Sequence, residues 1–384
     1  MVKEADALAE AGFDVTLVSG SHFAPASVLD DAILRRARWR HVAVPLQRGR
    51  QASARRLLRR VLRAARVPCR TVRLARMRAC PEWRSLASAA SSVRASLYHS
   101  HCLGGLVAAA AAARDNSAVL GFDAEDFHEE ETDAVMRDRH EQGAIRLLLR
   151  HHLPEAKLLT AASPCIAEAF RIHHGVAMQV VLNAFEPVDT RTGYTGPFTS
   201  SRPAKLYWFS QTMGAGRGLE QAVAILDRMN TPAEMWLRGF VRDDYRLELA
   251  RFGAGRIKFL PPGAPDDMVA MAAEADAGLA LELPHPPNRD MCLTNKVFVY
   301  LAAGLPQIMS ATTAQVGFAR DLGDAALVVD LNNAEAAARQ IDGWLGAPSK
   351  FAQAAASARV MGRRYSWAGE KSKFLAVVDS ALRG

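Results

Sequence analysis

A glycine-rich turn near the middle of the chain has the residue types that bind phosphate. Residues 206–209 form an apolar run that predicts a buried strand, and the apolar spacing after residue 219 predicts a helix. The turn between them contains three glycines and one arginine, namely Gly214, Gly216, Arg217 and Gly218. Glycines allow a close backbone approach to a ligand, and a helix N-terminus presents free N–H groups. The turn therefore predicts a phosphate or diphosphate site to which Arg217 adds positive charge. A solvated loop arginine is the alternative.

Histidines and acids at the ends of two predicted strands are the other candidates for chemistry. His99 and His101 stand at the end of the strand 96–100, and an acidic loop with Asp123, Glu125 and Asp126 follows the strand 118–122. Histidine titrates near neutral pH, and perturbed acids cluster at functional sites. The alternatives are core or rim histidines with satisfied hydrogen bonds, and acids that cap the following helix. The sequence leaves both readings open.

The second half of the chain alternates regularly between strands and helices. Strands are predicted at 204–209, 234–238, 256–260, 277–282, 305–309 and 326–329. Such alternation is typical of a parallel sheet covered by helices on both faces. Ligand sites in these sheets lie at the carboxyl ends of the strands. We expect the loops 99–104, 123–131, 210–218 and 288–296 to face a common cleft.

The first half repeats this pattern but opens differently. Residues 2–12 read as a helix with Gly12 at its C-terminal cap, and residues 13–19 read as a strand. A doubly wound domain normally opens with a strand, so the first strand is predicted to be absent from this chain.

The predicted domains are 1–185, with an arginine-rich insert at about 35–94, and 204–360. A linker at 186–203, rich in Pro, Thr, Gly and Ser, joins them, and a helix at 361–384 crosses back to the first.

Three stretches, 3–15, 211–219 and 294–306, resemble the GT-B glycosyltransferases and specifically the retaining glycosyltransferase family 4. The last stretch, with its Gly-Leu-Pro exit after a Lys-containing helix, is the most specific of the three. The resemblance implies an α/β fold of two Rossmann-like doubly wound domains facing across a cleft. It implies transfer of a sugar from a nucleotide-sugar donor with retention, and usually without a metal or other cofactor. The product would be a polysaccharide, a glycoconjugate or a secondary metabolite.

The resemblance also implies roles for individual residues. His101, Asp123 and Asp126 would approach the reacting sugar as the catalytic group. Arg217, Lys296 and the backbone N–H groups of the glycine turn would stabilise the leaving diphosphate, on which charge grows in the transition state. The donor-binding residues would be Gln211, Gly214, Gly216, Arg217, Gly218, Gly239, Pro262, Asp290, Asn295 and Lys296.

One departure from the family pattern keeps alternative functions open. The family carries two glutamates eight positions apart near this helix, whereas this chain has Met291 and Val299. Valine cannot accept a hydrogen bond from ribose, so Asp290 or Asn295 would have to substitute. The alternative functions are a catalytically silent GT-B binding or scaffold protein and, less favoured, a nucleotide-sugar epimerase.

The net charge of +8 comes from one arginine-rich segment, because Glu82 is the only acid between Arg35 and Arg94. Within it, residues 54–66 predict a helix with Leu57, Leu58, Val61, Leu62 and Ala65 on one face and arginines around it. Such a helix could lie on an anionic membrane, which would suit a lipid-linked acceptor. It could instead pack its apolar side on the sheet. Nucleic acid is disfavoured, since no aromatic residues interleave with the arginines.

Composition restricts the class of protein further. The chain has 384 residues, of which 49% are hydrophobic and 23% charged, as expected for a globular protein of two domains. No apolar run reaches the roughly 20 residues of a membrane-spanning helix, and the N-terminal residues lack a signal peptide's apolar core. The five cysteines are scattered, without zinc-site spacing. We therefore expect a cytoplasmic protein without a structural metal, associated at most peripherally with the inner membrane face.

Overall fold

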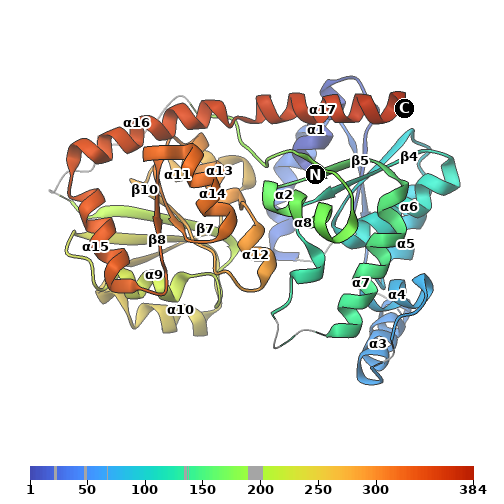
Figure 1. Cartoon of the computed structure of the whole chain (residues 1–384), viewed down its shortest axis with the longest axis horizontal. Helices are drawn as coiled ribbons and strands as arrows, with labels where there is room; N and C mark the ends of the chain where they lie inside the picture. The colour runs from blue at the N-terminus through green and yellow to red at the C-terminus, as the bar shows by residue number, and fades with distance from the viewer. Residues whose placement is uncertain (21–23, 47–49, 67, 134–135, 137, 189–201) are drawn as a thin grey trace. The chain divides into compact units, whose positions relative to one another are not determined.

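The computed structural model describes all residues except 21–23, 47–49, 67, 134–135, 137 and 189–201 (Figure 1). The described residues form two compact units. The first comprises Met1–Leu182, Pro286–Asn288 and Lys371–Gly384, and the second comprises Asn183–His285 and Arg289–Glu370. Most of the predicted linker 186–203 lies outside the described residues.

The second unit is built on a parallel sheet whose strand order defines a doubly wound fold. Its described strands are β7 (Ala204–Thr212), β8 (Ala233–Phe240), β9 (Ile257–Leu260), β10 (Ala277–Ala280), β11 (Gln307–Ser310) and β12 (Ala326–Val329). The predicted strands of this half are thereby confirmed, with ends shifted by a few residues. The order across the sheet is β12-β11-β10-β7-β8-β9, so the direction of winding reverses between β7 and β10. Ligands of doubly wound sheets bind beyond the carboxyl ends of the strands at this switch point.

Helices accompany this sheet along the chain. They are α9 (Leu219–Leu226), α10 (Asp243–Ala250), α11 (Met268–Ala272), α12 (Pro287–Met291), α13 (Asn295–Ala302), α14 (Thr313–Leu322), α15 (Ala334–Leu345) and α16 (Pro348–Arg364). The apolar core joins residues of β7, β8 and β10 to residues of α9 and α15.

Helix α13 is held against the sheet by Tyr300, which fixes the position of Lys296 at its start. Tyr300 is fully buried, and its hydroxyl donates to the carbonyl oxygens of Tyr207 on β7 (3.0 Å) and Leu279 on β10 (3.2 Å). Gly278 makes room for the ring, because a Cβ at that position would lie 2.3 Å from Tyr300. The helix is buried from Lys296 to its end, so its first turn cannot shift relative to the strands.

The first unit has two separate parallel sheets within the described part of the chain. Strands β1 (Thr16–Gly20) and β2 (Arg40–Val44) form one, and β3 (Leu97–His101), β4 (Val119–Ala124), β5 (Ala156–Ala161) and β6 (Gln179–Val180) form the other. Helix α1 (Val2–Glu10) precedes β1, with Gly12 at a φ of 94° in the turn, as the sequence predicts. In the doubly wound order 3-2-1-4-5-6, a strand before α1 would pair with both β1 and β3. Within the described residues, β1 and β3 belong to different sheets.

The arginine-rich segment contains more structure than the sequence predicts. The predicted helix is α3 (Arg50–Ala64), and α2 (Ala24–Arg36), β2, α4 (Val72–Ala79) and α5 (Trp83–Ser91) accompany it. Arg78 of α4 is fully buried and donates to the Asp138 carboxylate at 2.5 Å and to the Leu62 carbonyl at 2.9 Å. Asp138 in turn caps α7 (Arg139–His152). This arginine therefore ties three helices together and is not available to a ligand.

The rest of the first unit consists of α6 (Cys102–Asn116), α8 (Pro164–His174) and the end of α17 (Trp367–Arg383). From α17, Lys371 contacts Glu10, and the Phe374 ring lies 5.6 Å from the His99 ring. Among the described residues, no helix combines the length and the apolar character needed to cross a bilayer.

His152, at the end of α7, gives the first unit a predicted pH dependence. Burial, followed by the influence of His151 and Arg76, lowers the pKa of His152 to about 3. The unfolded chain binds a proton here at about pH 6.5, whereas the folded chain does not. The free energy of unfolding of the wild type is therefore expected to fall by about 1.4 kcal/mol per pH unit as the pH falls from about 6.5 toward 3. Urea unfolding across this range should show a shallower pH slope for His152→Gln than for the wild type. Parallel slopes would contradict the assignment.

Candidate functional site

Three basic side chains lie on the segments that follow β7 and β10, the two strands on either side of the switch point of the second unit. Arg217 and Arg289 lie at the glycine turn after β7. Lys296 lies beside the residue pair Glu282 and Trp208, which belong to the loop after β10 and to β7. We call Arg217, Arg289 and Lys296 the cation cluster. The sequence predicted the first and third of these, and the structure adds Arg289.

The glycine turn presents the N-terminus of α9 without a side-chain cap. Gly218 is the N-cap residue with a φ of 77°, and as a glycine it has no side chain to cap the first N–H groups of the helix. A Cβ at Gly218 would lie 3.1 Å from Leu331 and 3.2 Å from Leu281, so glycine lets the turn pack tightly. Glu220, the acid of the first turn, accepts a hydrogen bond from the Tyr245 hydroxyl at 2.7 Å. The N–H groups of the first turn and the positive end of the helix dipole are therefore suited to an anion.

Arg217 folds back over the end of β7. Its Nη1 donates to the Ser210 hydroxyl at 3.1 Å, and the side chain is partly buried. Arg289 donates to the carbonyl oxygen of Gly216 and so holds the turn from its other side. If Arg217 is to bind a phosphate, its guanidinium must lie near the carboxyl end of β7. Within the second unit, the side chain does lie there.

Lys296 is the buried member of the cation cluster. Its Nζ donates to Oε1 of Glu282 at 2.9 Å, and the two side chains are only 8% and 10% exposed. The Nζ also lies 5.6 Å from the ring centroid of Trp208. Sequence reasoning missed Glu282, although an acid two residues after a buried strand at a switch point is a recognisable signal. This buried ion pair with Glu282 fixes the position of the lysine ammonium group.

Other predicted donor-binding residues lie on the same strand ends and loops. Gly239 is in β8 with a φ of 145°, and a Cβ there would lie 2.1 Å from the Ser210 carbonyl oxygen. Pro262 is partly buried in the loop after β9, where Arg238 donates to the neighbouring Pro261 carbonyl at 2.8 Å. Gln211 is exposed, and Gly214 has open space around it.

The two residues suggested for ribose binding already have partners. Asp290 accepts from the backbone N–H (2.8 Å) and hydroxyl (2.5 Å) of Thr313, at the start of α14. The Asn295 side-chain oxygen accepts from Asn183 at 2.6 Å. Val299 is fully buried in α13. Within this unit, Asp290 therefore stabilises the start of α14.

In the first unit, two of the three predicted catalytic residues, His101 and Asp123, belong to a larger acid–histidine cluster. His101 Nδ1 lies 3.3 Å from Asp123 and 3.2 Å from Glu125, and its Nε2 lies 2.6 Å from Glu4 of α1. Asp123 also accepts a hydrogen bond from Thr160 at 2.5 Å. Sequence reasoning missed Glu4, because no local spacing links α1 to the end of β3.

Burial and charge act in opposite directions on the titration of this cluster. Burial lowers the pKa of His101, but Glu4, Asp123 and Glu125 outweigh it and raise the pKa well above the usual value. Burial raises the pKa of Glu4, but His101 and the N-terminal amine outweigh it and lower the pKa below its usual range. Burial alone dominates at His99 and lowers its pKa to about 4. Burial and the neighbouring acids thus shift the pKa values of the two histidines in opposite directions.

Asp126 lies apart from this histidine cluster. Its Oδ1 accepts from Asn288 Nδ2 at 2.6 Å, while Asn288 Oδ1 accepts from the Phe127 backbone N–H at 2.7 Å. The structure therefore brings Asp123 to His101, while Asp126 anchors the 286–288 segment to the first unit. The predicted common cleft involves both units and stays a prediction.

The strand orders and the similarity to solved structures define the class: the chain has the GT-B fold, with two Rossmann-like α/β parallel-sheet domains. The sucrose-phosphate synthase of Thermosynechococcus elongatus is similar, with a TM-score of 0.71 and 14% identity over 98% of this chain and 91% of that chain. HepE of Anabaena, solved with UDP and glucose, has a TM-score of 0.66 and 14% identity over 96% of this chain and 100% of that chain. WaaG, a glycosyltransferase involved in lipopolysaccharide biosynthesis, has a TM-score of 0.61 and 12% identity over 97% of this chain and 92% of that chain.

The similarity is one of fold and not of sequence. No protein-family profile matches this chain, and no curated protein sequence matches it either. The predicted GT-B fold is confirmed, whereas membership of glycosyltransferase family 4 stays a prediction.

Proposed function

We propose that this protein is a glycosyltransferase that moves a sugar from a nucleotide-sugar donor to an acceptor. The observation that carries the proposal is the cation cluster beside the uncapped start of α9, at the switch point of the second unit. A diphosphate gains negative charge as the sugar departs, and preorganised cations lower the energy of that state. HepE, which shares the fold, has been solved with UDP and with UDP-glucose, and this supports a nucleotide-sugar as the donor class.

In this proposal, the second unit binds the donor and the first unit acts on the sugar. Arg217, Lys296 and the N–H groups after Gly218 bind the diphosphate, which then needs neither a metal ion nor a cofactor. Gly239 and Pro262 line the nucleobase side. His101 and Asp123, whose side chains lie 3.3 Å apart, face the reacting hexose, which is transferred with retention. The enzyme would be a member of the retaining family 4 and serve polysaccharide or glycoconjugate synthesis.

Nucleotide binding is the first test of this proposal. Calorimetric titration of the full chain with UDP, GDP and ADP should give a Kd below about 1 mM for at least one of them, which corresponds to about −4 kcal/mol. Binding of none of the three would remove the proposal.

Val299 supports a second candidate, a catalytically silent protein that uses the same site for binding only. Its buried valine gives the ribose no hydrogen-bond acceptor. Binding of a nucleotide without donor hydrolysis or transfer to any tested acceptor would favour this candidate. Conversion of a donor without an acceptor would instead indicate an epimerase.

We further propose that α3 places the enzyme on an anionic membrane, as a peripheral cytoplasmic protein with a lipid-linked acceptor. The apolar side of α3 does not pack on a sheet: Leu57 is 63% exposed, Val61 53% and Leu58 41%. Arg60 and Arg66 are exposed beside them. An apolar face flanked by arginines matches the headgroup region of an anionic bilayer.

Removal of this apolar face should weaken membrane binding. The double variant Leu57→Gln, Val61→Gln should bind vesicles containing phosphatidylglycerol about 10- to 100-fold more weakly than the wild type, because two aliphatic side chains no longer enter the lipid. Co-sedimentation measures this. Leu247→Gln is the matched control, since Leu247 of α10 is 64% exposed in the other unit. Equal loss in the control, or none in the double variant, would contradict the membrane role.

A further inference from the structure

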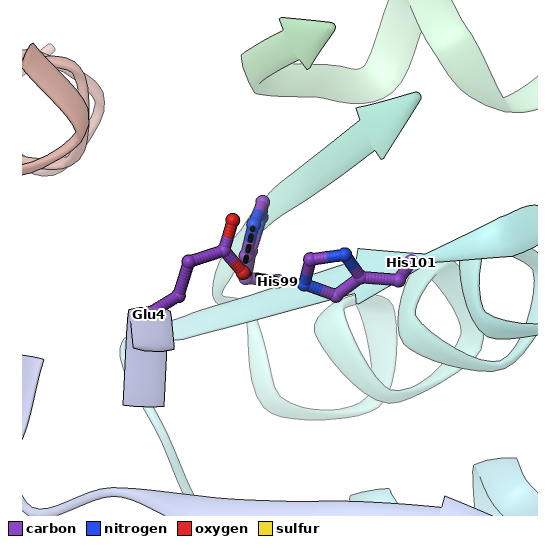
Figure 2. A group of neighbouring side chains, drawn as sticks. All are labelled: Glu4, His99 and His101. Carbon is purple, nitrogen blue, oxygen red and sulfur yellow. Dashed lines mark ion pairs between the residues drawn. The ribbon is translucent and has the colours of Figure 1, made fainter. Parts of the chain in front are cut away.

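Three potential metal ligands converge where α1 meets the end of β3. Glu4 extends from α1 toward the imidazole rings of His99 and His101 on β3 (Figure 2). Its Oε2 lies 2.6 Å from His101 Nε2 and 3.7 Å from His99 Nε2. One ligand atom from each of the three residues lies within 4.8 Å of the others. His99 and His101 share a face because residues two apart on a strand point the same way.

An ion pair between Glu4 and His101 does not explain why His99 is buried without a hydrogen-bond partner. Its side chain is only 9% exposed, and neither ring nitrogen has a hydrogen-bond partner among the described residues. A buried polar group without a partner costs about 1–3 kcal/mol, and such groups in native structures call for an explanation such as a bound ion. A pair between Glu4 and His101 would satisfy those two side chains and leave His99 unsatisfied.

The spacing of these atoms fits a tetrahedral ion. Zinc bonds imidazole nitrogen and carboxylate oxygen at about 2.0–2.1 Å, which places neighbouring ligand atoms about 3.3 Å apart. The observed separations of 2.6 Å and 3.7 Å lie on either side of that value. Two histidines and one glutamate are also a known zinc ligand set, with a fourth position open to water.

Two further acids, Asp123 and Glu125, lie against the ring nitrogen of His101 that does not face Glu4. Histidines that bind a metal usually donate their other ring N–H to a carboxylate, which fixes the tautomer and the ring orientation. His101 Nδ1 faces Asp123 Oδ2 at 3.3 Å and Glu125 Oε1 at 3.2 Å, on the side of the ring away from Glu4. Asp123 is itself held by the Thr160 hydroxyl at 2.5 Å.

From this arrangement we infer that Glu4, His99 and His101 form a binding site for a divalent transition-metal ion of the zinc type. Asp123 positions His101 in this site. The inference goes beyond the proposed function, because it adds a metal ion that the proposal does not use and because its ligands all lie in the first unit, away from the proposed diphosphate site. It gives His101 and Asp123, which the proposal places at the reacting sugar, a second role as ligand and positioning residue. The sequence analysis expected no structural metal, because it searched for ligands with zinc-site spacing along the chain. The ligands proposed here lie on two elements 95 residues apart in sequence (Glu4 to His99), so such a search does not find them.

Zinc binding to the full chain tests the inference. After treatment with a chelator, the protein is titrated with Zn²⁺ in the presence of a chromogenic competitor. We expect one tightly bound equivalent and a rise in Tm on binding. Glu4→Gln and His99→Ala should each raise the Kd by at least 100-fold, and Asp123→Asn by about 10- to 100-fold. Circular dichroism establishes that each variant is folded.

The chain offers a matched control in a second group of potential ligands, His151, His152 and Glu155. His151→Ala should bind Zn²⁺ as the wild type does. Co²⁺ gives an independent measurement, because imidazole and carboxylate ligands in a tetrahedral site produce visible absorption that His99→Ala should abolish. Absence of stoichiometric binding would overturn the inference. So would unchanged affinity in both Glu4→Gln and His99→Ala, or loss of binding in His151→Ala.

Discussion

Replacement of Arg217 by alanine is expected to lower kcat/KM for the nucleotide-sugar donor by about 100-fold, or about 2.7 kcal/mol of transition-state stabilisation. The guanidinium lies at the end of β7, where it donates to the Ser210 hydroxyl at 3.1 Å beside the free N–H groups of α9. Charge on the diphosphate grows as the bond to the sugar breaks, so a fixed cation there acts mainly on the transition state. We therefore expect a larger fall in kcat than rise in KM.

The control for this variant is Arg228→Ala. Arg228 is exposed two residues after the end of α9, and its Nη1 donates back to the Ala224 carbonyl of that helix at 2.8 Å. Steady-state kinetics of donor hydrolysis or transfer, together with thermal unfolding, separate a catalytic effect from a structural one. An Arg217→Ala enzyme with wild-type kcat/KM would show that the arginine only braces the loop, and a matching loss in Arg228→Ala would show that the effect is not local.

Gly239→Ala is expected to cost about 3–4 kcal/mol of folding free energy and to remove nucleotide binding. The added Cβ would lie 2.1 Å from the Ser210 carbonyl oxygen, and the φ of 145° is strained for any residue with a Cβ. The clash would separate β8 from the end of β7. Since Ser210 is the hydrogen-bond partner of Arg217, the same displacement disturbs the cation cluster.

Chemical denaturation and nucleotide calorimetry on Gly239→Ala measure both effects. Gly343→Ala is the matched control: it lies in α15, has open space around it and should change stability by at most about 1 kcal/mol, toward higher stability. If Gly239→Ala unfolds at the wild-type denaturant concentration, the close contact between the two strand ends does not exist in solution.

Local patterns account for the parts of the fold that were predicted correctly. In the second unit, buried strands such as 204–209 are short apolar runs, and helices with a 3.6-residue period separate them, so strand positions and parallel pairing follow from periodicity. The turn at Gly216 and Gly218 was predictable because positive φ angles favour glycine. Strand β2 was missed, because Arg40 and His41 are both exposed and make the start of the strand resemble the surrounding arginine-rich sequence.

The sequence by itself determined the fold class, the glycine turn and the identity of two cations, because each depends on residues that are neighbours along the chain. Only the tertiary structure decided which charged side chains pair with which partners. It pairs Lys296 with Glu282, assigns Asp290 to the start of α14, buries Arg78 against Asp138 and brings Glu4 to two histidines on β3. These pairs join elements that lie far apart in sequence, and their partners are chosen by packing and by the cost of burying an uncompensated charge. No spacing rule along the chain encodes such a choice.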